Sequence, residues 1–172
     1  MTRSVATIGV FDGVHLGHQA ILRAALARAR AVRCSAAVVT FDRHPLRTLA
    51  PRIAPRCLMT LDQRLARLRA EGFLRIVVLP FTRALAMLGA EAFVARVLVR
   101  RLRIAHVVVG YDFHFGRGGH GDAALLTALG SRLGFGVTVV PPVLLKGEPV
   151  SSTRIRKLLA VGDLGEAARQ LG

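Results

Sequence analysis

Short apolar runs alternate with helix-like segments from one end of the chain to the other. Each run is almost entirely apolar and is bounded by turn residues, which is the pattern of a buried strand. We expect five such strands, at residues 7–11, 36–41, 75–79, 106–110 and 136–140. Apolar strands separated by helices predict a parallel sheet that is covered on both faces. The expected fold class is therefore α/β, with a doubly wound, mostly parallel five-stranded sheet.

The segments between the strands have the composition and periodicity of helices. We expect helices at residues 18–30, 60–71, 85–102 with an interruption near Gly89, and 122–133, followed by two short helices that begin after Ser151 and Gly162. Thr60 and Gln63 have the spacing of a capping box, and Asp122 stands where it can cap the following helix. Residues 42–57 contain three prolines, which predict a long loop without regular structure.

The composition fits a single domain over residues 1–172, because 172 residues with 52% hydrophobic content can form one substantial core. No stretch has the apolar length that spans a bilayer, and the first residues do not resemble a signal peptide. A cytoplasmic location is expected. Cys34 and Cys57 stand apart, without the spacing of metal ligands or of a disulfide framework.

The charge balance is strongly basic, with 25 Lys and Arg against 10 Asp and Glu, for a formal net charge of +15. Such an excess suits a polyanionic ligand. An Ala/Arg/Gly-rich coding bias would produce the same excess, and the arginines are spread over all the expected helices. Aromatic residues make up 5% of the chain and tryptophan is absent, so stacking platforms for single strands are not evident. The sequence therefore disfavours nucleic acid as a partner.

The segment at the end of the first expected strand is the strongest candidate for a catalytic or binding site. Its sequence, TIGVFDGVHLGH at residues 7–18, leads from a buried strand through a turn to two histidines. His15 and His18 are three apart at a helix start, so both rings can face one point. Helix N-termini attract anions, and two imidazoles there can donate hydrogen bonds to developing negative charge. The structural alternative is that His18 caps the helix and His15 lies in a loop.

Three further segments bring polar side chains to the same edge of the sheet. Residues 41–45 follow the second strand, residues 110–116 follow the fourth, and residues 150–156 open a late helix with three hydroxyl-bearing side chains and two arginines. Guanidinium groups bind phosphate oxygens in a bidentate way, so Arg154 and Arg156 suit a polyphosphate. Ordinary helix capping explains the serines equally well, and an F-x-F pattern after a strand is usually core.

These four segments resemble, in the same order, the FMN adenylyltransferase (FAD synthetase) module of bacterial bifunctional riboflavin kinase/FMN adenylyltransferases. Residues 9–18 resemble the opening motif of that family and end in the H-x-G-H of the nucleotidyltransferase superfamily. Residues 110–116 are similar to its G-x-[DN]-F-x-F-G segment, and residues 151–156 to its S-S-T-x-x-R motif. The resemblance covers essentially the whole chain and implies a Rossmann-like nucleotidyltransferase fold.

The resemblance implies adenylyl transfer from ATP to FMN, giving FAD and pyrophosphate, with Mg²⁺ accompanying ATP. The FMN phosphate would attack the α-phosphorus in line, without a covalent enzyme intermediate. The expected catalytic residues are His15, His18 and Arg156. The expected ATP and phosphate contacts are Gly9, Phe11, Gly17, Ser151, Ser152, Thr153 and Arg154. The expected FMN contacts are His44, Asp112, Phe113 and Phe115, and the alternative role of Asp112 is to organise the metal site. No residue is assigned as a metal ligand.

The chain departs from the family pattern at two positions: Arg43 replaces the usual proline of an F-x-P-H-P loop, and Gly119 replaces a frequent basic residue. The P-T-A-N motif of the riboflavin kinase domain is absent, so we expect no riboflavin phosphorylation. Two alternatives remain. One is a nucleotidyltransferase that uses nicotinamide mononucleotide, phosphopantetheine or glycerol phosphate as acceptor, and the other is a non-catalytic module that binds nucleotides or nucleic acid. The sequence carries no signal for an oligomeric state.

Overall fold

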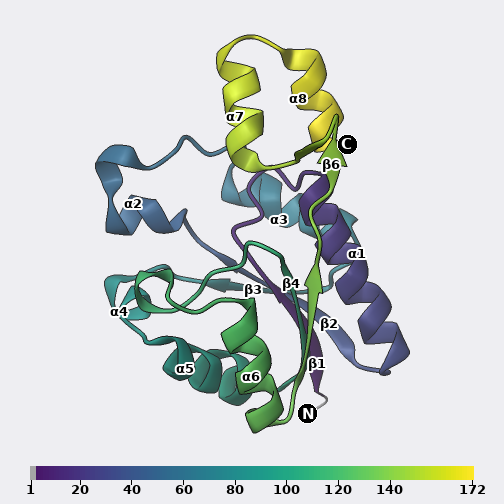
Figure 1. Ribbon diagram of the computed structural model, residues 1–172, viewed down its shortest axis with the longest axis vertical. Coiled ribbons are helices and arrows are strands. Elements are labelled where there is room, and N and C mark those ends of the chain that lie inside the picture. The colour runs from purple at the N-terminus through teal and green to yellow at the C-terminus, as the bar shows by residue number, and fades with distance from the viewer. Residues whose placement is uncertain (1–2) are drawn as a thin grey trace.

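The computed structural model describes residues 3–172, which form a five-stranded, entirely parallel sheet (Figure 1). The strands lie in the order β3-β2-β1-β4-β5. Their bounds are β1 Ser4–Ile8, β2 Ser35–Phe41, β3 Arg75–Leu79, β4 Ile104–Gly110 and β5 Gly136–Val140. All four pairings are parallel, which confirms the predicted sheet. A separate antiparallel hairpin, β6 Leu144–Leu145 with β7 Glu148–Pro149, follows β5 and was not expected.

Helices connect the strands, as the sequence predicts. The α-helices are α1 Leu16–Ala31, α2 Pro45–Leu49, α3 Leu61–Ala70, α4 Arg83–Ala86, α5 Ala90–Phe93, α6 Ala123–Leu133, α7 Ser152–Ala160 and α8 Leu164–Leu171. The remaining helical segments are the 3-10 turns η1 Pro51–Ile53 and η3 Arg117–Gly119, and the π-helical η2 Val94–Arg101, which continues α5. No helix within residues 3–172 is both long and apolar enough to cross a membrane.

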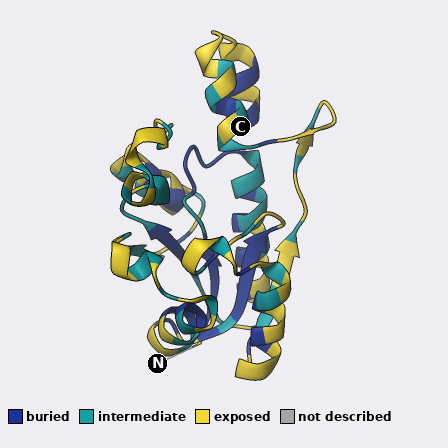
Figure 2. Cartoon of the chain, turned by 60° about the vertical axis from the view of Figure 1, so that its left-hand side comes forward, coloured by how far each residue is buried: buried dark blue, intermediate teal, exposed yellow. Residues whose placement is uncertain are grey.

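Two hydrophobic clusters, one on each face of the sheet, hold the fold together. Successive residues of a strand point to opposite faces, so Val38 joins one cluster and Val39 the other. On the face of Val38, α1 and α3 contribute residues such as Leu22 and Leu68. On the other face, α5, η2 and α6 contribute residues such as Leu98. The sheet is therefore doubly wound, with its buried centre between two helical layers (Figure 2).

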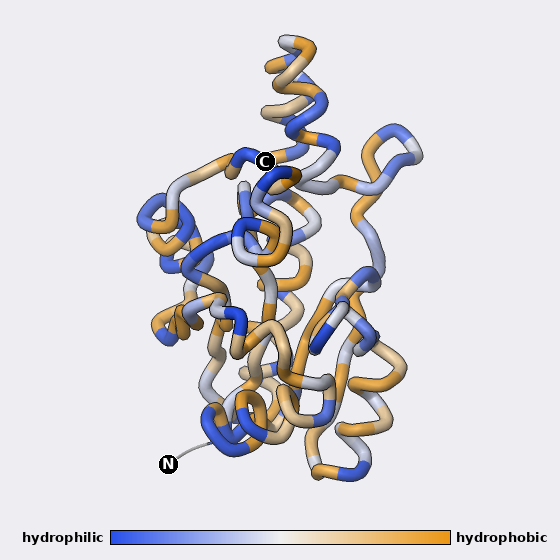
Figure 3. Tube along the Cα trace, turned by 90° about the vertical axis from the view of Figure 1, so that its left-hand side faces the viewer, coloured by the Kyte–Doolittle hydropathy of each residue, from blue (hydrophilic) through white to orange (hydrophobic). Residues whose placement is uncertain are grey.

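The strand order reverses direction between β1 and β4, and this places the polar loops. β2 and β3 follow β1 on one side, whereas β4 and β5 lie on the other. In sheets of this kind, ligands bind beyond the carboxyl ends of the strands at such a switch point. The loops after β1 and β4 meet there, and the α7–α8 pair projects past the same edge (Figure 1). Figure 3 shows that hydrophobic residues dominate the sheet, while hydrophilic and hydrophobic residues alternate along α7 and α8.

Several predicted boundaries were wrong, and each has a local cause. Residues 42–57 contain α2 and η1, because Pro45 and Pro51 stand at the first helical position, where a missing N–H has no cost. The first strand ends at Ile8, because Phe11 leaves the extended region with φ 53°. By contrast, the Thr60–Gln63 capping box and the Asp122 cap are confirmed.

Candidate active site

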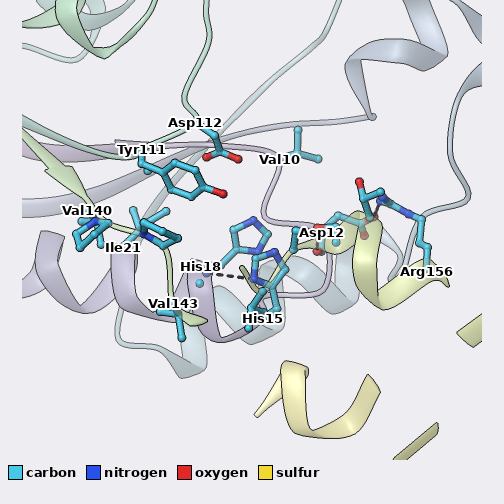
Figure 4. A pocket seen from close by; sticks show the side chains of 18 of the residues that line it. Val10, Asp12, His15, His18, Ile21, Tyr111, Asp112, Val140, Val143 and Arg156 are labelled. Atoms are coloured by element: carbon cyan, nitrogen blue, oxygen red, sulfur yellow. Dashed lines mark hydrogen bonds and ion pairs between the residues drawn. The ribbon is translucent and has the colours of Figure 1, made fainter. Parts of the chain in front are cut away.

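A cavity of about 240 Å³ lies beyond the carboxyl ends of β1 and β4 (Figure 4). The N-termini of two helices line it: His15, Gly17 and His18 come from the start of α1, and residues 151–153 come from the start of α7. Arg156 lies one turn further along α7. Two helix dipoles, their unpaired N–H groups and one guanidinium thus face a common space. This arrangement is typical of a site for phosphate groups.

The two histidines of the H-x-G-H motif are held as a stacked pair. Their ring centroids are 3.6 Å apart with an interplanar angle of 20°. Nδ1 of His15 accepts a hydrogen bond from the backbone N–H of His18, at 3.3 Å. His15, and not His18, is therefore the N-cap of α1, which begins at Leu16 two residues before the predicted start. Because Nδ1 of neutral His15 is an acceptor, its proton is on Nε2.

Burial keeps both histidines neutral. It lowers the pKa of His15 from 6.5 to about 4, although the Asp12 carboxylate opposes this shift, and the Arg156 guanidinium lowers the pKa further. Burial also places the pKa of His18 well below its usual value, with a smaller contribution from His15. At neutral pH the pair offers N–H donors rather than positive charge. Arg156 and the two helix N-termini are left to supply the attraction for an anion.

Asp12, in the turn after β1, links three segments of the chain. Its carboxylate accepts hydrogen bonds from the backbone N–H of Leu58 at 2.9 and 3.0 Å and of Met59 at 3.2 Å. Oδ2 also pairs with Nη2 of Arg156 at 2.5 Å, with only 3% of the Asp12 side chain exposed. A second donor of the same guanidinium is fixed as well, because Nε of Arg156 donates to the carbonyl of Arg56 at 2.7 Å.

The loop that carries Asp12 has a strained backbone. Phe11 has φ 53° and Val14 has φ 42°, values that bulky and β-branched residues rarely adopt. Gly13 between them has φ 91°, which a glycine accommodates without cost. Ser152 holds this loop from α7, since its Oγ donates to the carbonyl of Asp12 at 2.8 Å. Strain of this kind persists where the surrounding contacts enforce it, which is frequent at functional sites.

Gly17 allows the start of α1 to approach the start of α7. A Cβ at this position would lie 3.2 Å from the His15 ring and 3.3 Å from the carbonyl oxygen of Val150. Both contacts are tighter than ordinary van der Waals separation. The glycine of the H-x-G-H motif is thus required for the close packing between the histidine pair and residues 150–151.

Of the predicted phosphate contacts, the structure brings Gly17 and residues 151–153 to this cavity, but not Gly9, Phe11 or Arg154. Ser151 caps α7 through its Oγ, which accepts from the backbone N–H of Arg154 at 3.2 Å. The guanidinium of Arg154 points instead to the β6–β7 hairpin. There it donates to the carbonyls of Leu145 and Glu148, each at 3.3 Å, and pairs with the Glu148 carboxylate at 3.2 Å. Arg154 does not line the cavity, so its expected phosphate contact is not supported by its position.

A second, larger cavity of about 580 Å³ is lined mainly by apolar side chains. Phe41 and Phe81 meet edge to face with centroids 5.3 Å apart, and Phe113 stacks on Phe115 at 5.5 Å. The other aromatic lining residues are Phe11 and Phe93, and Gly9 and Gly119 contribute backbone to the wall. Phe11 and Phe115 are almost completely buried, with 1% and 5% exposed, so they also belong to the core.

The two cavities meet at one place. Val10, His18, Ile21, Gly110 and Asp112 line both of them. The His18 ring is fixed there between His15 and the edge of Phe11, whose centroid lies 5.3 Å away. A polar, phosphate-type space thus opens directly into an aromatic one.

The loop after β2 borders both cavities as well. His44 lines the polar cavity and Pro45 the apolar one. Nδ1 of His44 accepts from the N–H of Leu46 at 3.2 Å, and burial together with the Arg156 charge lowers the pKa of His44. Arg43, at the position of the usual proline, lies on the surface and pairs with Asp42 at 3.1 Å.

Comparisons with known proteins show the family of this chain. The family model described as FAD synthetase matches residues 1–154. The chain belongs to the FAD synthetase family.

Curated relatives of this FAD synthetase family member are named bifunctional riboflavin kinase/FMN adenylyltransferase. The one from Pseudomonas fluorescens is 43% identical over 168 residues, covering 98% of this chain and 54% of that protein. The one from Escherichia coli K12 is 37% identical over the same shares of the two chains. The chain therefore spans about half the length of the curated relatives that it matches.

Solved structures support the fold of this chain. A crystal structure described as a macrolide-efflux protein from Streptococcus pneumoniae superposes with a TM-score of 0.87 and 30% identity, over 100% of this chain and 57% of that one. Pantoate-beta-alanine ligase from Francisella tularensis, at 13% identity, superposes with a TM-score of 0.58 over 98% of this chain and 77% of that one. The second similarity shows a shared fold alone.

The carboxylates that line the polar cavity are those of Asp12 and Asp112. Within residues 3–172, no three or more His, Cys, Asp or Glu side chains are grouped to hold an ion. Asp12 is already used by Arg156 and two backbone N–H groups, whereas Asp112 is exposed on the cavity wall. Mg²⁺ commonly binds through one or two carboxylates together with substrate phosphates and water.

Two sets of lining residues were missed by sequence reasoning. Tyr111 and the segment 140–143 form one end of the polar cavity, yet Tyr111 is at a variable position of the motif at residues 110–116, and the segment 140–143 carries no motif. Tyrosine and proline after strands are common loop residues, so no signal in the sequence separates these from others. His106, in β4, lines neither cavity and has structural contacts: its ring lies 3.4 Å from Nε of Arg28 and 2.8 Å from Oγ1 of Thr138.

Proposed function

We propose that this chain transfers the adenylyl group of ATP to FMN and releases pyrophosphate. The observation that carries the proposal is the meeting of two cavities at His18 and Asp112. One cavity has the donors and charges that phosphates require, and the other has an aromatic lining and a volume suited to a flavin ring. Membership of the FAD synthetase family supports the same pair of substrates.

The reaction needs no nucleophile from the protein. An oxygen of the FMN phosphate attacks the α-phosphorus of ATP and forms the new P–O–P linkage. The bond between the α-phosphorus and the oxygen bridging to the β-phosphorus breaks, and that oxygen leaves as part of pyrophosphate. Catalysis of this kind depends on positioning and on stabilising charge on phosphate oxygens.

The residues around the polar cavity are assigned to the triphosphate. Nε2–H of His15 and the His18 ring donate to oxygens whose charge increases in the transition state. Arg156 and the N–H groups at the start of α7, with Ser152 and Thr153, bind the β- and γ-phosphates. Mg²⁺ bound with ATP would neutralise phosphate charge, with Asp112 as the available carboxylate ligand. Gly17 allows the starts of α1 and α7 to approach closely at this cavity. Gly9 lines the apolar cavity and not the polar one, so it is not assigned to the triphosphate.

The loops around the apolar cavity are assigned to FMN. Phe113 and Phe115 supply one wall for the ring system, and Pro45 and Phe81 lie in the same lining. His44 borders the polar cavity from the neighbouring loop, so its Nε2–H can reach the FMN phosphate. Phe11 belongs to this wall rather than to the triphosphate site, because it lines the apolar cavity and not the polar one.

The direct test is FAD formation from FMN, ATP and Mg²⁺, separated by chromatography, with His15→Ala as the comparison. The proposal predicts FAD with wild type and a large loss with the variant. It fails if FMN is unchanged by wild type, or if both proteins give equal turnover. A thermal-shift panel with nicotinamide mononucleotide, phosphopantetheine and glycerol phosphate addresses the alternative acceptors, since a bound ligand raises the melting temperature.

Three further expectations remain predictions. Residues 1–172 are expected to act as one adenylyltransferase domain without riboflavin phosphorylation, which an assay with riboflavin and ATP tests. The +15 charge is expected not to reflect nucleic-acid binding. Binding to FMN without binding to random DNA fits that expectation, whereas binding to random DNA with a steep salt dependence and none to FMN would favour the nucleic-acid alternative. The third expectation is that the protein is located in the cytoplasm.

A further inference from the structure

Tyr111 occupies an unusual position for a large aromatic residue. It follows β4 directly and lines the polar cavity, yet 48% of the residue remains exposed and it belongs to neither hydrophobic cluster. Its backbone is nevertheless fixed, because its N–H donates to the carbonyl of Val140 on the neighbouring strand at 3.0 Å. An aromatic ring on a rigid backbone, with a half-open face, has the properties of a stacking platform.

The surroundings of Tyr111 divide the polar cavity into two ends. Apolar groups gather near the ring, from Ile21 on α1 and from the segment 140–143 after β5. The histidines and Arg156 are at the other end, and Figure 4 shows the Tyr111 hydroxyl directed to the side of Asp112 and His18. A ligand that fills the whole cavity must therefore be apolar and flat at one end and anionic at the other. A nucleoside triphosphate has this character.

We propose that Tyr111 stacks on the nucleobase of ATP and positions the nucleotide along the polar cavity. The proposal rests on the proposed function for the identity of the nucleotide, but not for the presence of a base-binding end. The ring face, and not the hydroxyl, carries the interaction. A purine overlaps the ring more than a pyrimidine does, so Tyr111 also favours ATP over cytidine or uridine triphosphates.

The composition of the chain makes this proposal directly measurable. Tyr111 is the single tyrosine of the sequence, and there is no tryptophan. Tyrosine emission, excited where phenylalanine does not absorb, therefore reports on this one ring. Stacking on a base quenches such emission. Tripolyphosphate provides the matched control, because it offers the same anionic groups to His15 and Arg156 without a base.

The experiment titrates the protein with ATP and with tripolyphosphate in the absence of FMN, correcting for absorption with free N-acetyltyrosinamide. Strong quenching by ATP and none by tripolyphosphate is the expected result. Calorimetry then compares variants. Tyr111→Leu is expected to weaken ATP binding about tenfold and leave tripolyphosphate binding unchanged, whereas Tyr111→Phe keeps the ring and the affinity. Leu144→Ala, an exposed apolar change on the hairpin outside the cavity, is expected to have no effect.

Three results would overturn the proposal: ATP binding without a change in emission, equal quenching by tripolyphosphate, or no binding of ATP at all. A Tyr111→Leu variant with wild-type affinity for ATP would do the same. Because no step uses FMN, the outcome is separate from that of the proposed function. Quenching by ATP in a protein that makes no FAD would retain the stacking role and remove the adenylyl transfer.

Discussion

The Asp12 carboxylate lies 2.5 Å from Nη2 of Arg156, although 144 positions separate the two residues in the chain. This ion pair connects the loop after β1, which carries the histidine motif, with α7, which carries the distal S-S-T-x-x-R motif. Asp12 also accepts from the N–H groups of Leu58 and Met59, so the pair fixes a third segment. The two halves of the proposed phosphate site are therefore held in register by a single buried carboxylate.

Removing one partner of this ion pair should lower the free energy of unfolding. Asp12→Asn leaves the Arg156 guanidinium without its counter-ion and weakens two backbone hydrogen bonds. We expect the free energy of unfolding to fall by about 3 kcal/mol, the lower part of the range for broken buried pairs. Urea unfolding of Asp12→Asn, Arg156→Met and the double variant measures the coupling, which we expect to exceed about 1 kcal/mol.

An exposed ion pair provides the control for this comparison of single and double variants. Arg132 and Glu91 lie 3.5 Å apart with 64% and 65% of their side chains exposed. Glu91→Gln is expected to change stability by less than about 1 kcal/mol, as exposed pairs generally do. The buried pair does not link the two motifs if the losses of unfolding free energy for Asp12→Asn and Arg156→Met are additive in the double variant. An equally large loss for Glu91→Gln would lead to the same conclusion.

Gly17→Ala should impair function more than folding. The added Cβ meets the His15 ring at 3.2 Å and the Val150 carbonyl at 3.3 Å, so the histidine pair must shift by a few tenths of an ångström. We expect kcat/KM for FAD formation to fall roughly ten- to a hundredfold, because small displacements of positioned groups are costly in such reactions. Steady-state kinetics and thermal melting measure the two effects.

Gly165→Ala is the control for Gly17→Ala. A Cβ there has its nearest contact at 3.8 Å, with the flexible Arg169 side chain, in helix α8. We expect unchanged kinetics and a slight gain in stability, since alanine is the better helix former. Wild-type kinetics for Gly17→Ala would contradict the close approach of the two helix starts.

The buried histidines should make stability depend on pH. In the unfolded chain His15 binds a proton near pH 6.5, whereas in the folded protein its pKa is about 4. The unfolded state therefore binds more protons between these values. The stability associated with neutral His15 is fully present above about pH 6.5 and is lost as the pH falls toward 4, by up to about 3 kcal/mol.

Urea unfolding at pH 7.5 and at pH 4.5 tests this dependence in wild type and in His15→Gln. The glutamine variant lacks the titrating group, so its loss of stability over the same interval should be smaller by about 2–3 kcal/mol. Equal losses in the two proteins would mean that His15 is not buried in its neutral form.

Phe113 offers a test of the apolar cavity alone. It is half-buried, stacks on Phe115 and does not line the polar cavity. Phe113→Ala is expected to raise KM for FMN about tenfold and to leave KM for ATP unchanged, since an aromatic contact contributes on the order of 1–2 kcal/mol to binding. A change in KM for ATP of similar size would contradict the division of the site into two cavities.

Periodicity in the sequence predicted the sheet well, because buried parallel strands are runs of apolar residues bounded by glycine and charge. β3, β5 and α6 match the predicted limits, and the caps at Thr60 and Asp122 come from local hydrogen bonds that sequence spacing determines. Local patterns also identified the four loops at the sheet edge. What they could not determine depends on tertiary contacts.

Three residues illustrate that limit. Asp12 precedes a glycine, which is typical of a turn, and only the folded structure brings its carboxylate to Arg156. Arg154 has the chemistry of a phosphate ligand, yet the β6–β7 hairpin, which the sequence did not indicate, holds its guanidinium. Tyr111 is at a variable position of the motif at residues 110–116, and only the fold shows that it lines the polar cavity.

The central claim is that FMN and ATP react where the two cavities meet, and it is tested by following the α-phosphorus of ATP. Wild-type protein is incubated with α-labelled ATP, Mg²⁺ and one acceptor at a time: FMN, nicotinamide mononucleotide, phosphopantetheine or glycerol phosphate. The account predicts that label enters FAD alone, that one pyrophosphate is released for each FAD, and that none of the label stays on the protein. Label in another acceptor, or in the protein itself, would contradict it.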